Sequence, residues 1–268
     1  MLRAKKSLGQ HFLRSPHVIC RIVEFGRVQP GEPLLEIGSG TGALTRELLL
    51  RSDDLIAVEV DEEIAETWLR PLLCRFPRAQ LHTGDIRLFQ PAKFPGFGRR
   101  KVFGNLPYNI ATHLILTFAE PEWRPFLADM IFMVQKEVGE RIRASSGSRE
   151  YGYLSCICQL AFRVESGFTV SRGAFSPRPA VDSIVLRLAP RPGPPWDPAL
   201  WALLQALLKQ AFSQRRKTIR NCLKKSQFDP APLTEAGIAP TARPEQLPPE
   251  TYVRLARLYA GGGVSNVE

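Results

Sequence analysis

The sequence predicts an α/β protein in which a mainly parallel sheet is followed by a small all-helical domain. Short apolar runs alternate with stretches of helical periodicity over residues 1–190, which is the pattern of parallel strands joined by helices. A glycine-rich turn after the first such run indicates a nucleotide-binding unit. The proline-rich segment 190–195 then marks a boundary, and a leucine-rich helical pattern follows it.

The composition is that of a globular protein with a positive charge. The chain has 268 residues, 44% of them hydrophobic, and a formal net charge of +10, which favours a polyanionic partner. No apolar run is long enough to span a membrane, and the basic N-terminus lacks the apolar part of a signal peptide. We therefore expect a cytoplasmic protein. Five scattered cysteines without a CxxC pair predict reduced, mostly buried thiols and no metal site.

The first segment, RAKKSLGQHFLRS at 3–15, is basic but interrupted by Leu8, Phe12 and Leu13. These apolar residues predict an arm that packs against another surface, whereas a purely charged segment would be a solvated tail. Apolar residues at helical spacing then predict a helix over 16–26.

The segment LLEIGSGTG at 34–42 leads from an apolar run into alternate glycines, and a helix is expected over 43–50. Strand, glycine-rich turn and helix begin a nucleotide-binding βαβ unit. The GxGxG spacing differs from the GxGxxG of dinucleotide sites and from the P-loop. With Glu36 two residues before the first glycine, the pattern resembles S-adenosylmethionine-dependent methyltransferases.

The next two expected strands also end in acids. The strand 55–61 carries Glu59 about 20 residues after the glycines, where a carboxylate can bind both hydroxyls of a ribose. Asp61 is interpreted as a helix N-cap, because the helix 62–73 begins directly after it. The strand 80–83 runs into Asp85, which could accept a hydrogen bond from the amine of a cofactor adenine.

The fourth strand, 101–104, leads into Asn105-Leu106-Pro107-Tyr108. The Asn105 side-chain oxygen and the Leu106 carbonyl are two acceptors, Pro107 fixes the backbone, and Tyr108 offers a flat face. This set suits an exocyclic amine on a flat heterocycle, such as adenine N6. The alternative is a strand-ending turn in which Tyr108 is a packing residue.

The remaining elements complete the sheet. Helices are expected at 111–118, 135–143 and 153–161, and strands at 129–134, 162–169 and 181–188. Phe175 lies between the last two strands in a loop stiffened by prolines. It either packs within this loop or forms a second stacking surface opposite Tyr108.

A second domain is expected over 198–260, with a helix at 198–208, two short helices within 230–260, and a disordered tail at 261–268. No acid occurs between Asp197 and Asp229. This uncompensated positive charge predicts a surface for a nucleic-acid phosphate backbone. The candidate RNA-binding residues are Arg215, Arg216, Lys217 and Arg220.

Several segments together resemble the ribosomal RNA adenine N6,N6-dimethyltransferase family, in the order in which that family has them. They are KKSLGQHFL, LLEIGSGTGALT, VEVD, GD, FGNLPYNI, FMVQKEV, AFSPRPAVDS and AFSQRRKTIRN. The resemblance covers roughly residues 3–258 and implies a Rossmann-like class I methyltransferase fold with S-adenosyl-L-methionine as cofactor. It further implies methyl transfer to N6 of two adjacent adenosines in the 3′-terminal hairpin of 16S rRNA.

The resemblance also implies roles for single residues. His11, where many members have Asn, and Leu13 belong to a segment that lines the cofactor, and Gly38 matches the glycine at its amino-acid part. The other implied sites are Gly40 in the cofactor turn, Glu59 at the ribose, Asp85 at the adenine amine, Asn105 in the active site and Phe175 stacking on the target base.

The expected partner is 16S rRNA within the 30S subunit or its precursor, bound by a monomer that also acts in subunit biogenesis. One alternative is a 23S rRNA adenine N6-methyltransferase of the antibiotic-resistance type. Another is a non-catalytic assembly or nucleic-acid-binding factor on the same scaffold. The intact glycine turn, Glu59, Asp85 and the NLPY segment favour catalysis, and the C-terminal AFSQRRKTIRN favours the small-subunit branch. A DNA adenine methyltransferase would more often carry [DN]PPY, from which Leu106 departs.

Overall fold

The computed structural model describes residues 4–5, 8–94, 96–107, 110–191, 197–214, 216–224 and 226–261. The chain forms two compact units. The first comprises 1–118, 122–139 and 163–190, and the second comprises 119–121, 140–162 and 191–268. The sequence-based boundary near residue 190 therefore differs from this division, because 119–121 and 140–162 belong with the C-terminal helices.

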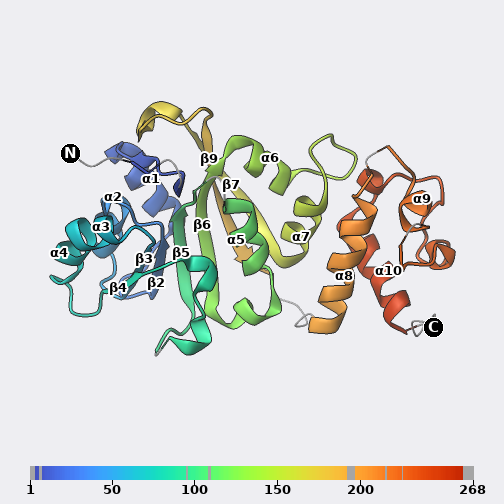
Figure 1. The fold of residues 1–268 in the computed structure, drawn as a ribbon, viewed down its shortest axis with the longest axis horizontal. Helices are drawn as coiled ribbons and strands as arrows, with labels where there is room; N and C mark the ends of the chain where they lie inside the picture. Colours follow the sequence, from blue (N-terminus) through green and yellow to red (C-terminus); the bar gives the residue numbers. More distant parts are fainter. Residues whose placement is uncertain are drawn as a thin grey trace. The chain divides into compact units, whose positions relative to one another are not determined.

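A sheet of seven strands, in the order β4-β3-β2-β5-β6-β9-β7, forms the centre of the first unit within the described residues (Figure 1). The strands are β2 (Leu34–Ile37), β3 (Leu55–Glu59), β4 (Gln80–Thr83), β5 (Arg100–Asn105), β6 (Leu127–Gln135), β7 (Phe162–Val170) and β9 (Ser183–Pro190). The pairs from β4 to β6 are parallel, and β9 is antiparallel to β6. This arrangement confirms the predicted parallel α/β sheet.

The central strands are apolar because helices cover both faces of a parallel sheet. Every residue of β2 and β3 is buried. The helices of the first unit are α1 (Pro16–Gly26), α2 (Ala43–Leu49), α3 (Glu62–Ile64), α4 (Arg70–Leu73), α5 (Ala111–Phe118) and the first part of α6 (Lys136–Arg143). Short 3-10 turns lie at η3 (Ile86–Leu88), η4 (Pro91–Lys93) and η5 (Pro121–Phe126).

The helix expected over 62–73 is interrupted by a π-helical turn, η2 (Ala65–Leu69). Pro71 lies just after this turn, inside α4. Proline has no backbone N–H, so the α-helical bond to the residue four positions earlier is lost there. The sequence predicted the extent of the helix and missed this change of hydrogen-bond register.

A second, two-stranded sheet joins the N-terminal arm to the loop of Phe175. The strand β1 (Phe12–Leu13) pairs antiparallel with β8 (Phe175–Ser176), which follows the turn η6 (Arg172–Ala174). Figure 1 shows the yellow segment of η6 beside the dark-blue start of the chain. The prediction that the arm docks is confirmed for residues 8–13, although strands this short were not predicted.

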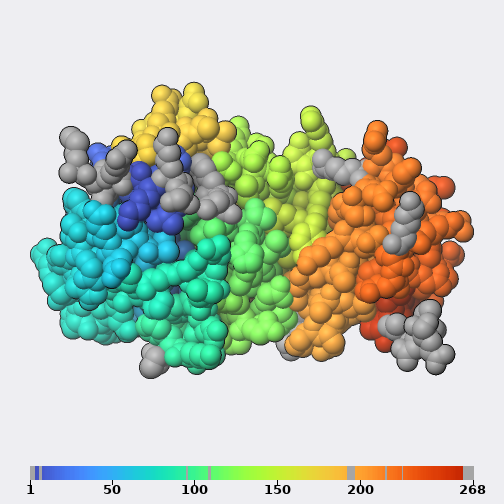
Figure 2. Space-filling model, in the orientation of Figure 1, coloured from blue at the N-terminus to red at the C-terminus, as the bar shows by residue number. Residues whose placement is uncertain are grey.

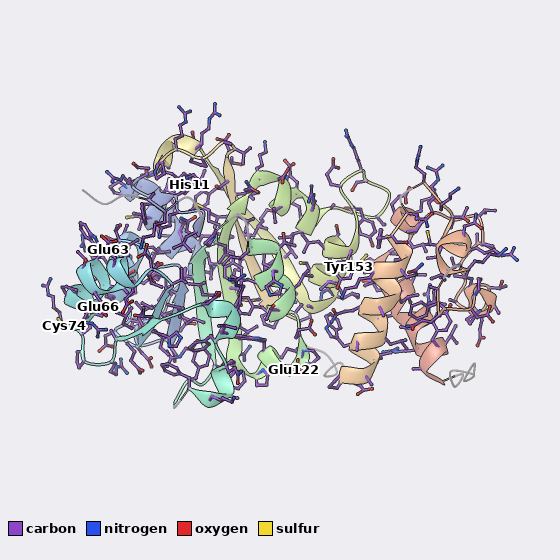
Figure 3. All side chains as sticks on the ribbon, in the orientation of Figure 1. His11, Glu63, Glu66, Cys74, Glu122 and Tyr153 are labelled. Carbon is purple, nitrogen blue, oxygen red and sulfur yellow. The ribbon has the colours of Figure 1, made fainter. Side chains whose placement is uncertain are left out.

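The second unit is helical, with α7 (Tyr153–Ala161), α8 (Pro198–Ala211), α9 (Ile219–Leu223) and α10 (Pro249–Gly261). The Tyr153 hydroxyl donates to the side-chain oxygen of Gln205 on α8 at 3.2 Å, and Figure 3 shows Tyr153 on α7 near α8. The Tyr151 hydroxyl donates to the carbonyl of Leu247 at 2.9 Å. These bonds link the segment 140–162 to the C-terminal part of the chain.

The prediction of two short helices within 230–260 was right for the last helix, which begins at Pro249 as α10, and wrong for the first. That stretch holds the 3-10 turns η7 (Ala231–Leu233) and η8 (Pro244–Gln246) and then the single helix α10. Six prolines between 230 and 249 remove backbone donors, which disfavours an α-helix between 230 and 248. Gly261 ends α10, and the rest of the predicted tail, 262–268, lies outside the described residues.

No helix in the described part of the chain is long and apolar enough to cross a membrane. Within the same residues, no three His, Cys, Asp or Glu side chains are grouped as metal ligands would be. The cysteines are free, with Cys156, Cys158 and Cys222 buried and Cys20 and Cys74 exposed.

Candidate active site

A cavity lies in the first unit where β2, β3, β4 and β5 end. The order of the strands reverses at β2, which lies between β3 and β5, and ligands of open α/β sheets bind at such a switch point. The cavity is lined by 8–13, 36–41, 43–44, 58–60, 84–87 and 105–107, with Ile110. All the residues that the sequence assigned to a cofactor are among them: His11, Leu13, Gly38, Gly40, Glu59, Asp85 and Asn105.

The glycine turn between β2 and α2 requires glycine for two reasons. Gly38 and Gly40 have φ values of +70° and +54°, a region that other residues avoid. A Cβ atom at Gly40 would also lie 3.2 Å from the ring of Phe12. The arm therefore packs directly on the turn.

Glu59 is held rigidly at the end of β3. One carboxylate oxygen accepts from the Gly40 N–H at 2.8 Å and the other from the Asp61 N–H at 3.0 Å. Burial raises the pKa of Glu59, against the opposing effect of these two N–H groups. Because each carboxylate oxygen can accept more than one hydrogen bond, the group is positioned and still able to bind a diol.

Glu36, on β2, is a buried acid in the same cavity. It is 2% exposed, and its Oε2 atom has no hydrogen-bond partner among the described residues. Burial raises the pKa of Glu36 to about 8, although the hydroxyls of Thr45 and Ser39 oppose this shift. An unpartnered buried polar atom of this kind calls for a polar or cationic ligand.

Asp85 lies after β4 and is paired with Arg87. Its carboxylate caps η3 by accepting from the Arg87 N–H at 2.9 Å, and it also accepts from the guanidinium, with Nε at 2.9 Å from Oδ2. The hydrogen bonds from Arg87 hold the pKa of Asp85 below its usual value. Asp85 is thus ionised and available as an acceptor at the cavity wall.

Asn105 lies at the end of β5 and contacts the arm. Its Nδ2 atom donates to the main-chain carbonyl of His11 at 2.9 Å. One of the two amide N–H donors is therefore used within the protein, and the side-chain oxygen can accept from a ligand. The His11 side chain contacts the loop after β8, with Nδ1 at 2.8 Å from the Pro177 carbonyl. Figure 3 labels His11 close to the yellow segment.

The residues after Asn105 are fixed by the main chain. The Leu106 N–H donates to the Met133 carbonyl on β6 at 3.1 Å, and the Pro107 carbonyl accepts from Ala111 at 3.0 Å at the start of α5. Leu106 and Pro107 line the cavity. Tyr108 lies outside the described residues.

Phe175 does not line the cavity. It is 6% exposed and belongs to a hydrophobic cluster that includes Leu13. Because the side chain is buried in this cluster, its stacking role stays a prediction. Of the basic candidates in the second unit, Arg216, Lys217 and Arg220 are exposed around the start of α9, and Arg215 lies outside the described residues.

Lys5 and Arg87 were not predicted to act at or beside this cavity, and Gln10 was expected only as part of the arm segment that lines the cofactor. Asp61 occupies the N-cap position of α3, as expected, but its side chain makes no capping hydrogen bond. Its carboxylate accepts instead from Lys5 at 2.7 Å and from Gln10 at 2.9 Å. Figure 2 shows dark-blue N-terminal residues at the surface, bordered by cyan and yellow segments. One sequence signal could have indicated the bond between Lys5 and Asp61. The N-terminal arm is basic, and the second expected strand ends in acids.

Comparison with known proteins agrees with this geometry. The family described as ribosomal RNA adenine dimethylase matches residues 1–261. The chain belongs to this family. The Ribosomal RNA small subunit methyltransferase A of Pseudomonas aeruginosa is 43% identical over 263 residues, covering 96% of this chain and 95% of the relative. Its namesake in Chromobacterium violaceum is 43% identical over 254 residues, covering 94% of each chain.

Solved structures of the same fold are also similar. A dimethyladenosine transferase from Plasmodium falciparum superposes with a TM-score of 0.78 and 25% identity, covering 94% of this chain and 98% of that one. The 23S rRNA methyltransferase ErmE superposes with a TM-score of 0.68 and 27% identity, covering 92% of this chain and 98% of that one. The predicted family, the Rossmann-like methyltransferase fold and the enzyme class, an rRNA adenine dimethyltransferase, are therefore confirmed. Family membership implies S-adenosylmethionine as the methyl donor.

Proposed function

We propose that this protein transfers methyl groups from S-adenosylmethionine to N6 of two adjacent adenosines in the 3′-terminal hairpin of 16S rRNA. The product would be N6,N6-dimethyladenosine. One observation carries the proposal: in a member of this family, a single cavity at the strand ends gathers the glycine turn, Glu59, Asp85 and Asn105. The relatives named for the small subunit are more similar to this chain than the 23S enzyme ErmE is, which favours 16S over 23S rRNA.

The cavity residues fit the cofactor. Glu59 would accept from the ribose hydroxyls, Asp85 from the adenine amine, and the turn of Gly38 and Gly40 would allow close approach of the amino-acid part. The unpartnered oxygen of Glu36 is a further acceptor for the cofactor's charged groups. When bound, the cofactor supplies an electrophilic methyl group.

Asn105 and the Leu106 carbonyl would act on the target base. The adenine amine is a weak nucleophile because its lone pair is delocalised into the ring. Two acceptors that bind its two hydrogens favour a tetrahedral nitrogen and orient the lone pair, which is catalysis by orientation and electrostatics. The bond from Asn105 to His11 fixes which amide atom faces the base. A neutral amide also adds no charge beside the target amine for the second methylation.

The target base must leave its stack to enter the pocket. Tyr108 and Phe175 would replace part of the lost stacking, at about 1–3 kcal/mol per base. Because Phe175 is buried in this structure, its role requires a change in the loop that carries β8. We propose both as stacking residues on the strength of the family resemblance.

The proposed partner is 16S rRNA in the 30S subunit or its precursor, bound by a monomer in the cytoplasm. Arg215, Arg216, Lys217 and Arg220 would contact its phosphates. The described members of this set are exposed, as such a role requires. A role in subunit biogenesis would follow from binding before maturation is complete.

Undermethylated 30S and 50S particles treated separately with the protein and S-adenosylmethionine would test the proposal. Mass spectrometry of the released nucleosides should find two N6,N6-dimethyladenosines per 30S particle and none added to 50S particles. Asn105→Ala should abolish the modification while the variant remains folded. Modification of the 50S particles alone would establish the 23S activity in its place, and full dimethylation by Asn105→Ala would remove Asn105 from the mechanism.

A further inference from the structure

The N-terminal arm, meaning residues 4–5 and 8–13, is fastened at three places. At its C-terminal end, β1 pairs with β8. In its middle, the carbonyl of His11 accepts from Asn105. Near its start, Lys5 and Gln10 bind Asp61. Because residues 8–13 line the cavity, the arm forms one of its walls.

The third fastening is a closed set of hydrogen bonds. Lys5 Nζ donates to Oδ1 of Asp61 at 2.7 Å, and Gln10 Nε2 donates to Oδ2 at 2.9 Å. The Lys5 main-chain N–H donates to Oε1 of Gln10 at 2.8 Å. The Asp61 side chain is 1% exposed, whereas that of Lys5 is 45% exposed. Both oxygens of a buried carboxylate are thus satisfied by the arm.

Asp61 is linked by a main-chain hydrogen bond to Glu59, the proposed ribose-binding residue. The Asp61 N–H donates to one oxygen of Glu59, and the Gly40 N–H donates to the other. Phe12 of the arm packs against Gly40. The segment 59–61 therefore carries the proposed ribose-binding acid, Glu59, and also binds the arm through Asp61.

A buried carboxylate without partners is costly, so Asp61 and the arm depend on each other. Burial alone would raise the pKa of Asp61, but the hydrogen bonds from Lys5 and Gln10 and the charge of Lys5 hold it below its usual value. The Asp61 side chain makes no capping hydrogen bond to α3, so helix capping does not account for an acid here. The ion pair with Lys5 is what requires an acid at this position.

We propose that Asp61, Lys5 and Gln10 are positioning residues that hold the arm closed over the cofactor cavity. By holding the arm, they also hold the His11 carbonyl that orients Asn105. This inference rests on the proposed function, because it takes the ligand of the cavity to be S-adenosylmethionine or its demethylated product.

The binding test uses S-adenosylhomocysteine and the full-length chain without RNA. Lys5→Met and Asp61→Asn should each weaken binding about tenfold in titration calorimetry, and the double variant should lose little more than either single one. Hydrogen exchange of the amides of 8–13 should be faster in both variants. Lys5→Arg should behave like the wild type. Arg78→Met, which breaks the exposed pair with Asp53, is the matched control and should leave both measurements unchanged.

The kinetic test separates positioning from a loss of fold. Lys5→Met should raise KM for S-adenosylmethionine about tenfold and lower kcat by less than about threefold, because saturating cofactor closes the arm. A merely destabilised enzyme would instead lose kcat at constant KM. If Asp61→Asn does not fold, Lys5→Met alone decides. Wild-type affinity and wild-type exchange in Lys5→Met would overturn the inference, whereas a wild-type protein that bound no S-adenosylhomocysteine would overturn the proposed function.

Discussion

Asn105 serves two neighbours with one amide. One amide N–H donates to the His11 carbonyl, and in the proposed mechanism the side-chain oxygen accepts from the substrate amine. Aspartate at this position would still offer an acceptor oxygen to the substrate. Its second carboxylate oxygen would replace Nδ2 and face the His11 carbonyl, which cannot donate a hydrogen bond. Asn105→Asp should therefore lower the methylation rate about 100-fold or more and weaken the binding of S-adenosylhomocysteine. Single-turnover methylation of 30S particles and calorimetry measure the two effects. Near wild-type values in both would show that the bond to His11 has no role in orientation.

The raised pKa of Glu36 leads to a second prediction, which concerns the stability of the cofactor-free protein as a function of pH. Its pKa is about 8 in the folded protein against an ordinary value of 4.5. Between these values the folded chain binds one more proton than the unfolded chain, so stability falls as pH rises. Glu36→Gln is neutral throughout and removes this loss.

The stability of Glu36→Gln relative to wild type should thus increase from about pH 5 to about pH 8, by up to about 1.4 kcal/mol per pH unit. Urea unfolding at several pH values measures it. Glu24→Gln, at an exposed carboxyl, is the matched control and should show no such trend. Parallel pH profiles for Glu36→Gln and wild type would contradict the raised pKa.

Single residues were predictable where strand order places them. Glu59, Asp85 and Asn105 end successive strands, and parallel strands bring their carboxyl ends to one edge of the sheet. The bonds of Asp61 to Lys5 and Gln10 join residues 56 and 51 positions apart. No local pattern encodes such a pairing. The burial of Phe175 depends equally on packing that the sequence does not display.

Among elements, three helices with clear apolar periodicity were predicted closely. The helices α1, α5 and α7 begin and end where the pattern placed them, because each has an apolar face that spans several turns. The strands β1 and β8 have two residues each, which is too short for any periodicity. The prolines after 230 should have prevented the prediction of helices before α10.

The glycine turn yields a prediction at the scale of the element. Gly40→Ala would strain a residue at φ +54° and press a Cβ atom against Phe12, so both the turn and the arm must shift. Affinity for S-adenosylhomocysteine should fall about tenfold or more, because Gly40 and the arm both line the cavity and both must shift. Gly96→Ala is a matched control, because Gly96 has φ +67° and no atom within 4 Å of the added Cβ. It should lose some stability and keep its affinity. Equal affinities for both variants would show that the turn does not contact the cofactor.

For the whole molecule, the division into units was predicted in part. Helices after the proline-rich segment form the core of the second unit, as their leucines indicated. The segment 140–162 joins them through contacts such as the bond from Tyr151 to Leu247. These residues are far apart in the chain, and no proline-rich or glycine-rich linker precedes 140. The boundary therefore depends on tertiary packing, which composition does not reveal.

The basic surface of the second unit makes the last prediction. Arg216 and Arg220 are exposed at the turn before α9 and on α9. Arg216→Glu with Arg220→Glu should weaken binding to 30S particles and reduce the slope of log affinity against log salt by about 2, because each arginine replaces about one counterion on phosphate. Affinity for S-adenosylhomocysteine should not change, since both residues belong to the second unit and the cavity to the first. Arg51→Glu with Arg75→Glu alters two exposed arginines of the first unit and changes the net charge equally. If this control weakens 30S binding as much, then overall charge, and not this surface, determines the binding.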